Sequence, residues 1–220
     1  MSPPDPAHAR AALPPLPQTA LAGEVIDLVT RAESPPLANH SIRSYLFARL
    51  AADDRHLAPG TDYDPELLLA ACLLHDIGLT AEGDRGQRFE VNGADMAAEI
   101  LGRHRRTRQD IDAVWQAIAL NTSIGIAQRR GPIAALTLAG VSIDFGQGSD
   151  LLPDRTAAAV HHAYPRLSIA RVLTDAIVEH ARRAPEGAPP FSMAAELSRQ
   201  RAAPGHLSTL EDMARSSRWG

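Results

Sequence analysis

The sequence predicts an all-α protein, a single helical bundle of about seven to nine helices. Apolar residues recur at three- and four-residue spacing along most of the chain, and Pro and Gly steps separate the segments. No segment alternates apolar and polar residues for long enough to indicate a β-strand. A length of 220 residues is enough for one domain with a well-buried core.

The chain begins with a segment rich in Pro and Ala. Because Pro resists regular structure, we expect residues 1–20 to form a flexible arm. The first helix is expected over residues 21–32, where apolar residues share one face. Ser34-Pro35-Pro36 breaks this pattern, and the next helix is expected over residues 39–56.

The most apolar helix begins at Asp64-Pro65, because Asp is a strong N-cap and Pro is favoured at the first helical position. Residues 67–74 are apolar on all sides, which predicts a central position in the bundle. Gly78 is a natural stop. The domain would cover residues 21–203 and leave residues 204–220 as a frayed tail. Further helices are expected over residues 88–104, 106–123, 132–146, 153–164, 168–183 and 191–200.

Composition removes several classes of function. The net charge of −4 gives no broad basic field, so nucleic acid and anionic membranes are not expected as partners. The chain has no lysine, which excludes Schiff-base catalysis and a Walker A phosphate loop. No apolar run is long enough to cross a bilayer, no secretory signal begins the chain, and Cys72 is the lone cysteine. We therefore expect a cytoplasmic protein with a small-molecule substrate, and homo-oligomerisation stays open.

Ionisable side chains interrupt three apolar helices. His75-Asp76 ends the most apolar one, Asp144 ends another, and His40 begins a third. Burying such charges without a partner is costly, and a metal ion would offset that cost. Imidazole and carboxylate are ligands for Zn²⁺, Fe²⁺, Mn²⁺, Co²⁺ and Ni²⁺. We therefore predict one divalent metal ion, bound by His40, His75, Asp76 and Asp144.

This H…HD…D arrangement resembles the HD superfamily of metal-dependent hydrolases. The linked segments NHSIRSYLFA, LLLAACLLHDIGLT, RFEVNGADMAAEIL and GVSIDFG are similar to its cyanamide hydratase branch, and the resemblance runs from about residue 37 to residue 191. It implies an HD-domain helical bundle with one ion, usually zinc, that adds water to the nitrile carbon of cyanamide to give urea. The metal would lower the pKa of its bound water so that hydroxide attacks the nitrile.

The chain departs from the family at Asn121, where a histidine is usual in a segment that reads L-H-T-S. An amide cannot exchange a proton as imidazole does, so the substrate is expected to be cyanamide or a related nitrile-like or C–N compound. The predicted catalytic residues are Glu90 as acid or base, Asn121 and Thr122. The alternatives are a helix-start carboxylate for Glu90 and a turn cap for Thr122.

Three residues near the predicted ligands are assigned to substrate binding: Asn39, Arg43 and Thr80. Asn39 fits a helix N-cap equally well, and Thr80 fits a turn cap. Arg43 lies one helical turn beyond His40, where it also fits a surface position or pairing with a carboxylate.

Two other functions stay open. An HD phosphohydrolase would act on a nucleotide or a phosphate monoester, although Ile77-Gly78-Leu79-Thr80 after the histidine–aspartate pair carries no charge. A non-catalytic small-molecule binding domain would keep the metal as a structural staple. A second metal is not expected, because His104 is the only histidine between Asp76 and Asp144. His161-His162 is interpreted as a surface pair, and Cys72 as a small core residue.

Overall fold

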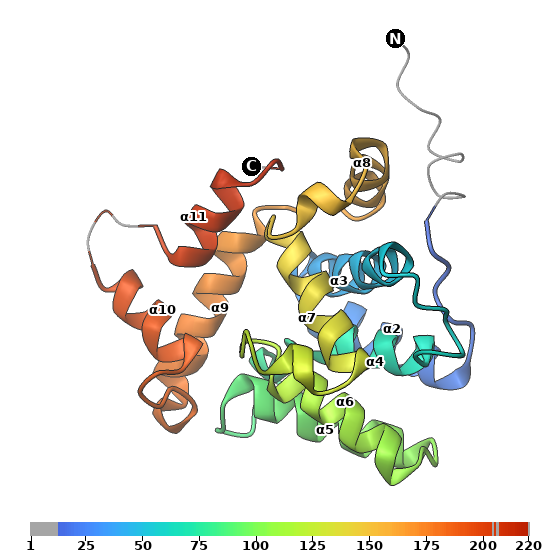
Figure 1. Cartoon of the computed structure of the whole chain (residues 1–220). Helices are drawn as coiled ribbons and strands as arrows, with labels where there is room; N and C mark the ends of the chain where they lie inside the picture. Colours follow the sequence, from blue (N-terminus) through green and yellow to red (C-terminus); the bar gives the residue numbers. More distant parts are fainter. Residues whose placement is uncertain (1–12, 204, 206, 220) are drawn as a thin grey trace.

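The computed structural model describes residues 13–203, 205 and 207–219. Within that part of the chain it contains ten α-helices and no β-strand, so the all-α prediction is confirmed (Figure 1). Most of the predicted arm, residues 1–12, lies outside the described residues. Leu13 and Leu16 pack against the main hydrophobic core, so this end of the arm is held in place.

The helical pattern breaks after Ala32, as predicted, but the prolines at positions 35 and 36 begin the next helix rather than lie outside it. Helix α2 spans Ala20–Ala32 and α3 spans Pro35–Asp54. Proline suits the first turn of a helix, where its missing N–H has no partner to lose. As a result α3 begins four residues earlier than expected, and Asn39 is not its N-cap.

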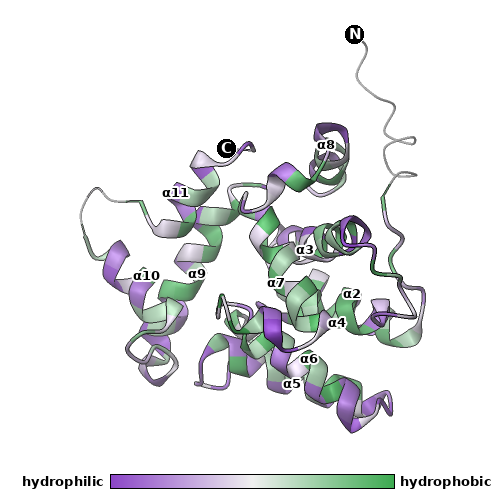
Figure 2. Ribbon diagram, viewed as in Figure 1, coloured by the Kyte–Doolittle hydropathy of each residue, from purple (hydrophilic) through white to green (hydrophobic). Residues whose placement is uncertain are grey.

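Helix α4 (Pro65–Leu74) forms the centre of the bundle, as its sequence predicts. The Asp64 carboxylate caps it by accepting from the Glu66 N–H at 2.7 Å, and every residue from 67 to 74 is buried. Helices α2, α3, α6 (Arg108–Ala119) and α7 (Pro132–Asp144) pack around it. Figure 2 shows α7 mostly in green, as expected for a second apolar helix.

The crossing of α3 and α7 depends on Gly140. A Cβ atom at this position would lie 2.0 Å from the Ser44 carbonyl oxygen, so only glycine allows the two backbones to approach this closely. Ser44 follows His40 by one helical turn and Gly140 precedes Asp144 by one turn. The close crossing therefore brings His40 and Asp144 together.

Helix α5 (Phe89–Arg103) packs on α6, and α8 spans Asp154–Ala163.

The last three helices lie together at one side of the bundle (Figure 1): α9 (Ile169–Arg183), α10 (Met193–Arg201) and α11 (Thr209–Ser216). A second hydrophobic cluster joins these helices to Phe89 and Phe145.

The prediction of a frayed tail over residues 204–220 is wrong for the described part of that segment. A capping box between Ser208 and Glu211 begins α11, and Leu210 is buried in the second cluster. Trp219 lies parallel to the Phe47 ring. The tail is ordered because its apolar residues find partners far away in the sequence.

None of the helices in the described ranges combines the length and the hydropathy that crossing a membrane requires.

Candidate metal centre

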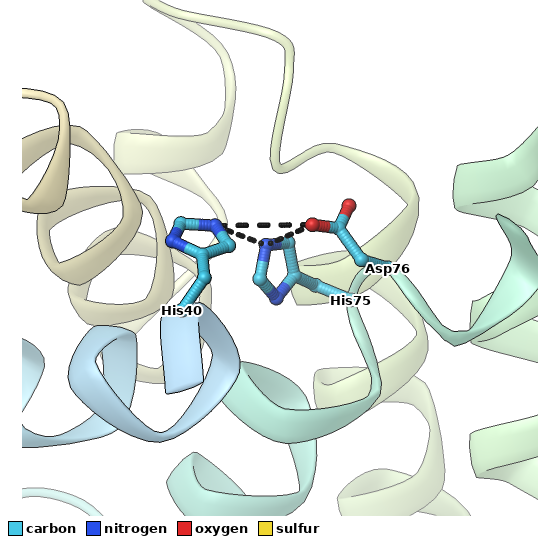
Figure 3. Close-up of side chains that lie close together, drawn as sticks. All are labelled: His40, His75 and Asp76. Carbon is cyan, nitrogen blue, oxygen red and sulfur yellow. Dashed lines mark hydrogen bonds and ion pairs between the residues drawn. The ribbon is translucent and has the colours of Figure 1, made fainter. Parts of the chain in front are cut away.

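His40, His75 and Asp76 meet in the interior of the bundle (Figure 3). The Nε2 atoms of His40 and His75 are 3.2 Å apart, and Asp76 Oδ2 lies 3.2 Å from His75 Nε2 and 3.8 Å from His40 Nε2. All three side chains are buried. The helices that carry them, α3 and α4, contribute many residues to the main hydrophobic core.

His75 and Asp76 are consecutive, and their side chains can meet because the regular α-helix ends at this point. His75 is the C-cap of α4, and Asp76 begins a short 3₁₀ turn over Ile77–Leu79. The turn fits closely against α5, where a Cβ at Gly78 would lie 2.1 Å from the Phe89 carbonyl oxygen. The sequence predicted this arrangement, because adjacent side chains on a continuous helix point about 100° apart.

The hydrogen bonds behind the two rings fix which nitrogen faces the centre. His40 Nδ1 donates to Asp144 Oδ2 at 2.6 Å, and His75 Nδ1 donates to the Cys72 carbonyl at 2.7 Å. Carboxylate and carbonyl oxygens only accept, so both Nε2 atoms present lone pairs to one another. Asp76 Oδ2 accepts no hydrogen bond from the described residues. Three facing electron pairs require a cation or a proton, and this donor set fits a divalent metal ion.

The electrostatics of the cluster agree with this need for positive charge. Burial opposes the charged form of His75, but the Asp76 carboxylate outweighs it and raises the pKa of His75 to about 9. Burial would raise the pKa of Asp76, yet the charge of His75 holds it below its ordinary value. Burial lowers the pKa of His40. In the absence of metal, a proton on His75 takes the place of the cation.

Asp144, the fourth predicted ligand, lies behind His40 rather than within the cluster. Arg43 donates a hydrogen bond to each carboxylate oxygen, from Nε to Oδ1 and from NH2 to Oδ2, both at 2.7 Å. Burial would raise the pKa of Asp144, but Arg43 keeps it well below the ordinary value. The ligand atoms that lie within 4.8 Å of one another belong to His40, His75 and Asp76. Asp144 orients His40 in this structure, and its direct coordination of the metal stays a prediction.

Two residues that were not predicted to belong to the site lie near these groups. His161, expected at the surface, is half-buried with Nε2 at 3.9 Å from Asp144 Oδ1, whereas His162 is exposed. Glu33 is buried and accepts from the Ser41 hydroxyl at 3.0 Å. Burial and the charge of Asp76 raise the pKa of Glu33 to about 8. The histidine pair was visible in the sequence, but helix packing decided that His161 faces Asp144. No local sequence signal pointed to Glu33.

The predicted catalytic residues form a second polar group beside the cluster. Glu90 is buried and points inward, where it accepts from the Thr122 hydroxyl at 2.9 Å and pairs with Arg88 at 2.8 Å. Asn121 is also buried, and its amide nitrogen donates to the Ile118 carbonyl at 2.7 Å. The structure thus brings Glu90 and Thr122 together, as a pair rather than as separate candidates.

The three residues assigned to substrate binding have other partners. Asn39 donates to the Pro165 carbonyl at 2.9 Å, and Arg43 is committed to Asp144. The Thr80 hydroxyl donates to the Ile77 carbonyl and accepts from the Gly83 N–H, so it caps a turn. These contacts indicate that the three side chains hold neighbouring segments in place. None of the three lines the cavity that adjoins the cluster.

A cavity of about 710 Å³ adjoins the cluster. Its lining includes His75 and Asp76 together with Asn121 and Thr122, whereas His40 and Glu90 are not part of it. Much of the remaining wall is apolar and includes Phe89, Phe145, Leu173, Ile177, Leu197 and Leu210. Cys72 lies outside this lining in the main core, and burial raises its pKa to about 12.

Comparison with known proteins agrees with this geometry. Residues 37–146 match the HD domain family, and the chain belongs to that family. The cyanamide hydratases DDI2 and DDI3 of Saccharomyces cerevisiae are each 31% identical to it over 164 residues, which cover 72% of this chain and 71% of the yeast protein. An uncharacterized protein of Clostridium beijerinckii is 24% identical over 79 residues, 36% of this chain and 50% of that protein.

Proposed function

We propose that this protein is a metal-dependent hydratase that adds water to the carbon of a nitrile-like or C–N group, as in the conversion of cyanamide to urea. The observation that carries the proposal is the convergence of His40, His75 and Asp76 beside a cavity that can admit a substrate. A bound Zn²⁺ ion would lower the pKa of a coordinated water and so supply the nucleophile at neutral pH. The names of the yeast relatives support this choice of reaction.

Thr122 at the cavity wall, and Glu90 bonded to it, are proposed to transfer the proton. Hydration of a nitrile removes a proton from water and adds one to the nitrogen. Glu90 and Thr122 form a hydrogen-bonded pair with the hydroxyl at the wall, so we assign them the transfer of that proton. Because its amide nitrogen is held by Ile118, Asn121 can offer its amide oxygen to an N–H of the substrate.

The charge of the cavity wall disfavours a phosphate substrate. A phosphate ester needs cationic partners, usually arginine in bidentate geometry. The one arginine in the described lining is Arg199, and it is paired with Glu196 on its own helix. A neutral substrate therefore suits this cavity better than a nucleotide.

The test is product formation by the zinc-loaded protein. Wild-type protein is expected to convert cyanamide to urea and methylcyanamide to methylurea, and His75→Ala is expected to form neither product. Absence of both products with one equivalent of zinc bound would overturn the proposal. In that case, phosphate release from a nucleotide panel, abolished by Asp76→Ala, would identify a phosphohydrolase. Metal-dependent stability without turnover of either class would identify a structural staple.

A further inference from the structure

The cavity beside the metal centre is far larger than cyanamide. We propose, as an extension of the function proposed above, that the preferred substrate is an N-substituted cyanamide whose amino nitrogen carries an apolar group of about six carbons or more. The cyanamide end would lie at His75 and Asp76, and the apolar group would occupy the space toward α9, α10 and α11.

Volume is the first argument. Cyanamide has only three non-hydrogen atoms and takes up roughly the space of two water molecules, about 60 Å³. The cavity measures about 710 Å³, within the range of roughly 300–1,000 Å³ found for sites that bury drug-sized ligands. Free cyanamide would leave most of this space to water and would contact only a small part of the wall.

The chemistry of the wall is the second argument. Leu173, Ile177, Leu197 and Leu210 offer no hydrogen bonds to the water that would fill the space around a small substrate. Water with few polar partners is readily displaced by an apolar group. The charged side chains of α10 that line the cavity, Glu196 and Arg199, are paired with one another, so they offer no net charge to a charged substituent.

The rim of the cavity is the third argument. Ile124 is 68% exposed and Phe191 is fully exposed, and both line the cavity. They come from segments far apart in the chain, since Ile124 follows α6 and Phe191 precedes α10. Exposed large apolar side chains at the edge of a pocket are typical of sites that receive apolar ligands.

The reaction is the same addition of water. R–NH–C≡N and H₂O give R–NH–C(=O)–NH₂: both O–H bonds of water break, a C=O bond forms, and the C≡N triple bond becomes a C–N single bond whose nitrogen takes both protons. No oxidant, reductant or further reactant is needed. The substituent R takes no part in the bond changes, so its contribution comes from binding to the apolar wall.

A series of chain lengths tests the proposal. The zinc-loaded full chain would be assayed with cyanamide and with its N-methyl, N-propyl and N-hexyl derivatives. Burial of each methylene is expected to raise kcat/KM by roughly threefold, which makes the hexyl compound at least about 100-fold better than the methyl compound. A flat or falling series would overturn the proposal and leave the hydratase function intact.

A cavity-filling variant locates the effect. Ala195 lines the cavity on α10 and is half-buried, and Ala158 is exposed on α8. Ala195→Phe is expected to reduce the ratio of the hexyl rate to the methyl rate by at least about tenfold, because the new ring takes the space of the alkyl chain. Ala158→Phe, the matched control, should leave that ratio unchanged. Equal ratios in the two variants would contradict the placement of the alkyl group.

Binding of the product separates this proposal from the proposed function. N-hexylurea and N-methylurea would be titrated calorimetrically into metal-free protein, where no turnover is required. The proposal predicts that hexylurea binds at least about 100-fold more tightly and that Ala195→Phe weakens it by tenfold or more. If no cyanamide is hydrated but this preference holds, the hydratase function fails and the apolar site stands. Equal affinity for the two ureas would overturn the apolar site.

Discussion

The two hydrophobic clusters of this protein differ in how completely they are filled. The larger cluster surrounds α4, where all residues from 67 to 74 are buried, and it contains the helices that carry His40 and His75. The smaller cluster joins Phe89 and Phe145 to α9, α10 and α11, and several of its members line a cavity of about 710 Å³.

The difference in packing follows a division of the chain between metal binding and the cavity wall. The metal-ligand cluster and most of the larger hydrophobic core lie within residues 37–146, the part of the chain that matches the HD domain family. Much of the far wall of the cavity comes from helices beyond residue 146. A closely packed region suits ligands that must be held in place, and a less filled region suits recognition of a substrate. The family core would then supply the reaction, and the C-terminal helices the choice of substrate.

Removal of a metal ligand should produce the largest effect in the filled region. His75→Ala is expected to lower the affinity for Zn²⁺ by more than about 100-fold, because even residues behind the ligands change affinity by 10- to 100-fold. Metal content after dialysis, measured by mass spectrometry, checks this. His162→Ala, at an exposed position of α8, is the control and should keep one equivalent. Retention of the metal by His75→Ala would show that the ion binds elsewhere.

Truncation of leucine compares the two clusters directly. Leu69→Ala, in fully buried α4, is expected to cost about 4 kcal/mol of unfolding free energy, because the core around it cannot collapse. Leu210→Ala should cost only about 2 kcal/mol, because Leu210 already borders open space. Urea denaturation measures both. Equal losses would contradict the view that the C-terminal cluster is incompletely filled.

The raised pKa of Glu33 predicts a dependence of stability on pH. Folded Glu33 keeps its proton up to about pH 8, and the ordinary pKa is 4.5. Stability from this group is therefore complete below pH 4.5 and is lost as the pH rises through 8. In the presence of a chelator, Glu33→Gln should avoid a loss on the order of 3 kcal/mol that the wild type shows between pH 5 and pH 8.

The control for Glu33 is the exposed carboxylate Glu186. Glu186→Gln should follow the wild-type pH profile, since its removal relieves no buried charge. Parallel profiles for Glu33→Gln and the wild type would mean that Glu33 is ionised in the folded protein.

Substitution at the crossing of α3 and α7 is expected to have one of the smaller effects. Gly140→Ala places a methyl group against the Ser44 carbonyl and is expected to cost about 2 kcal/mol through a shift of the two helices. Gly23→Ala, in an open position on α2, should instead stabilise by up to about 1 kcal/mol. Thermal unfolding of both variants measures the difference. A neutral Gly140→Ala would mean that the crossing is not tightly constrained.

The elements with strong local signals were predictable. Asp64-Pro65 fixed the start of α4 because capping acts within a few residues, and the apolar sequence that follows required a central position. The break after Ala32 was predicted, but the start of α3 was placed four residues too late, because the same residue that breaks a helix also begins one. Helix α11 was missed because a short amphipathic helix gains its stability from packing rather than from propensity.

For the site, the sequence by itself determined which residue types gather: His40, His75 and Asp76 interrupt apolar helices, and burial makes a cation at such positions favourable. Only the tertiary structure decided how they are used. In the folded protein, Asp144 lies behind His40 and is bonded by Arg43, and Glu90 is bonded by Thr122. The tertiary structure also closed a cavity with helices that are distant in the chain. Side-chain periodicity reports the buried face of a helix, whereas the angle at which two helices cross decides which side chains meet.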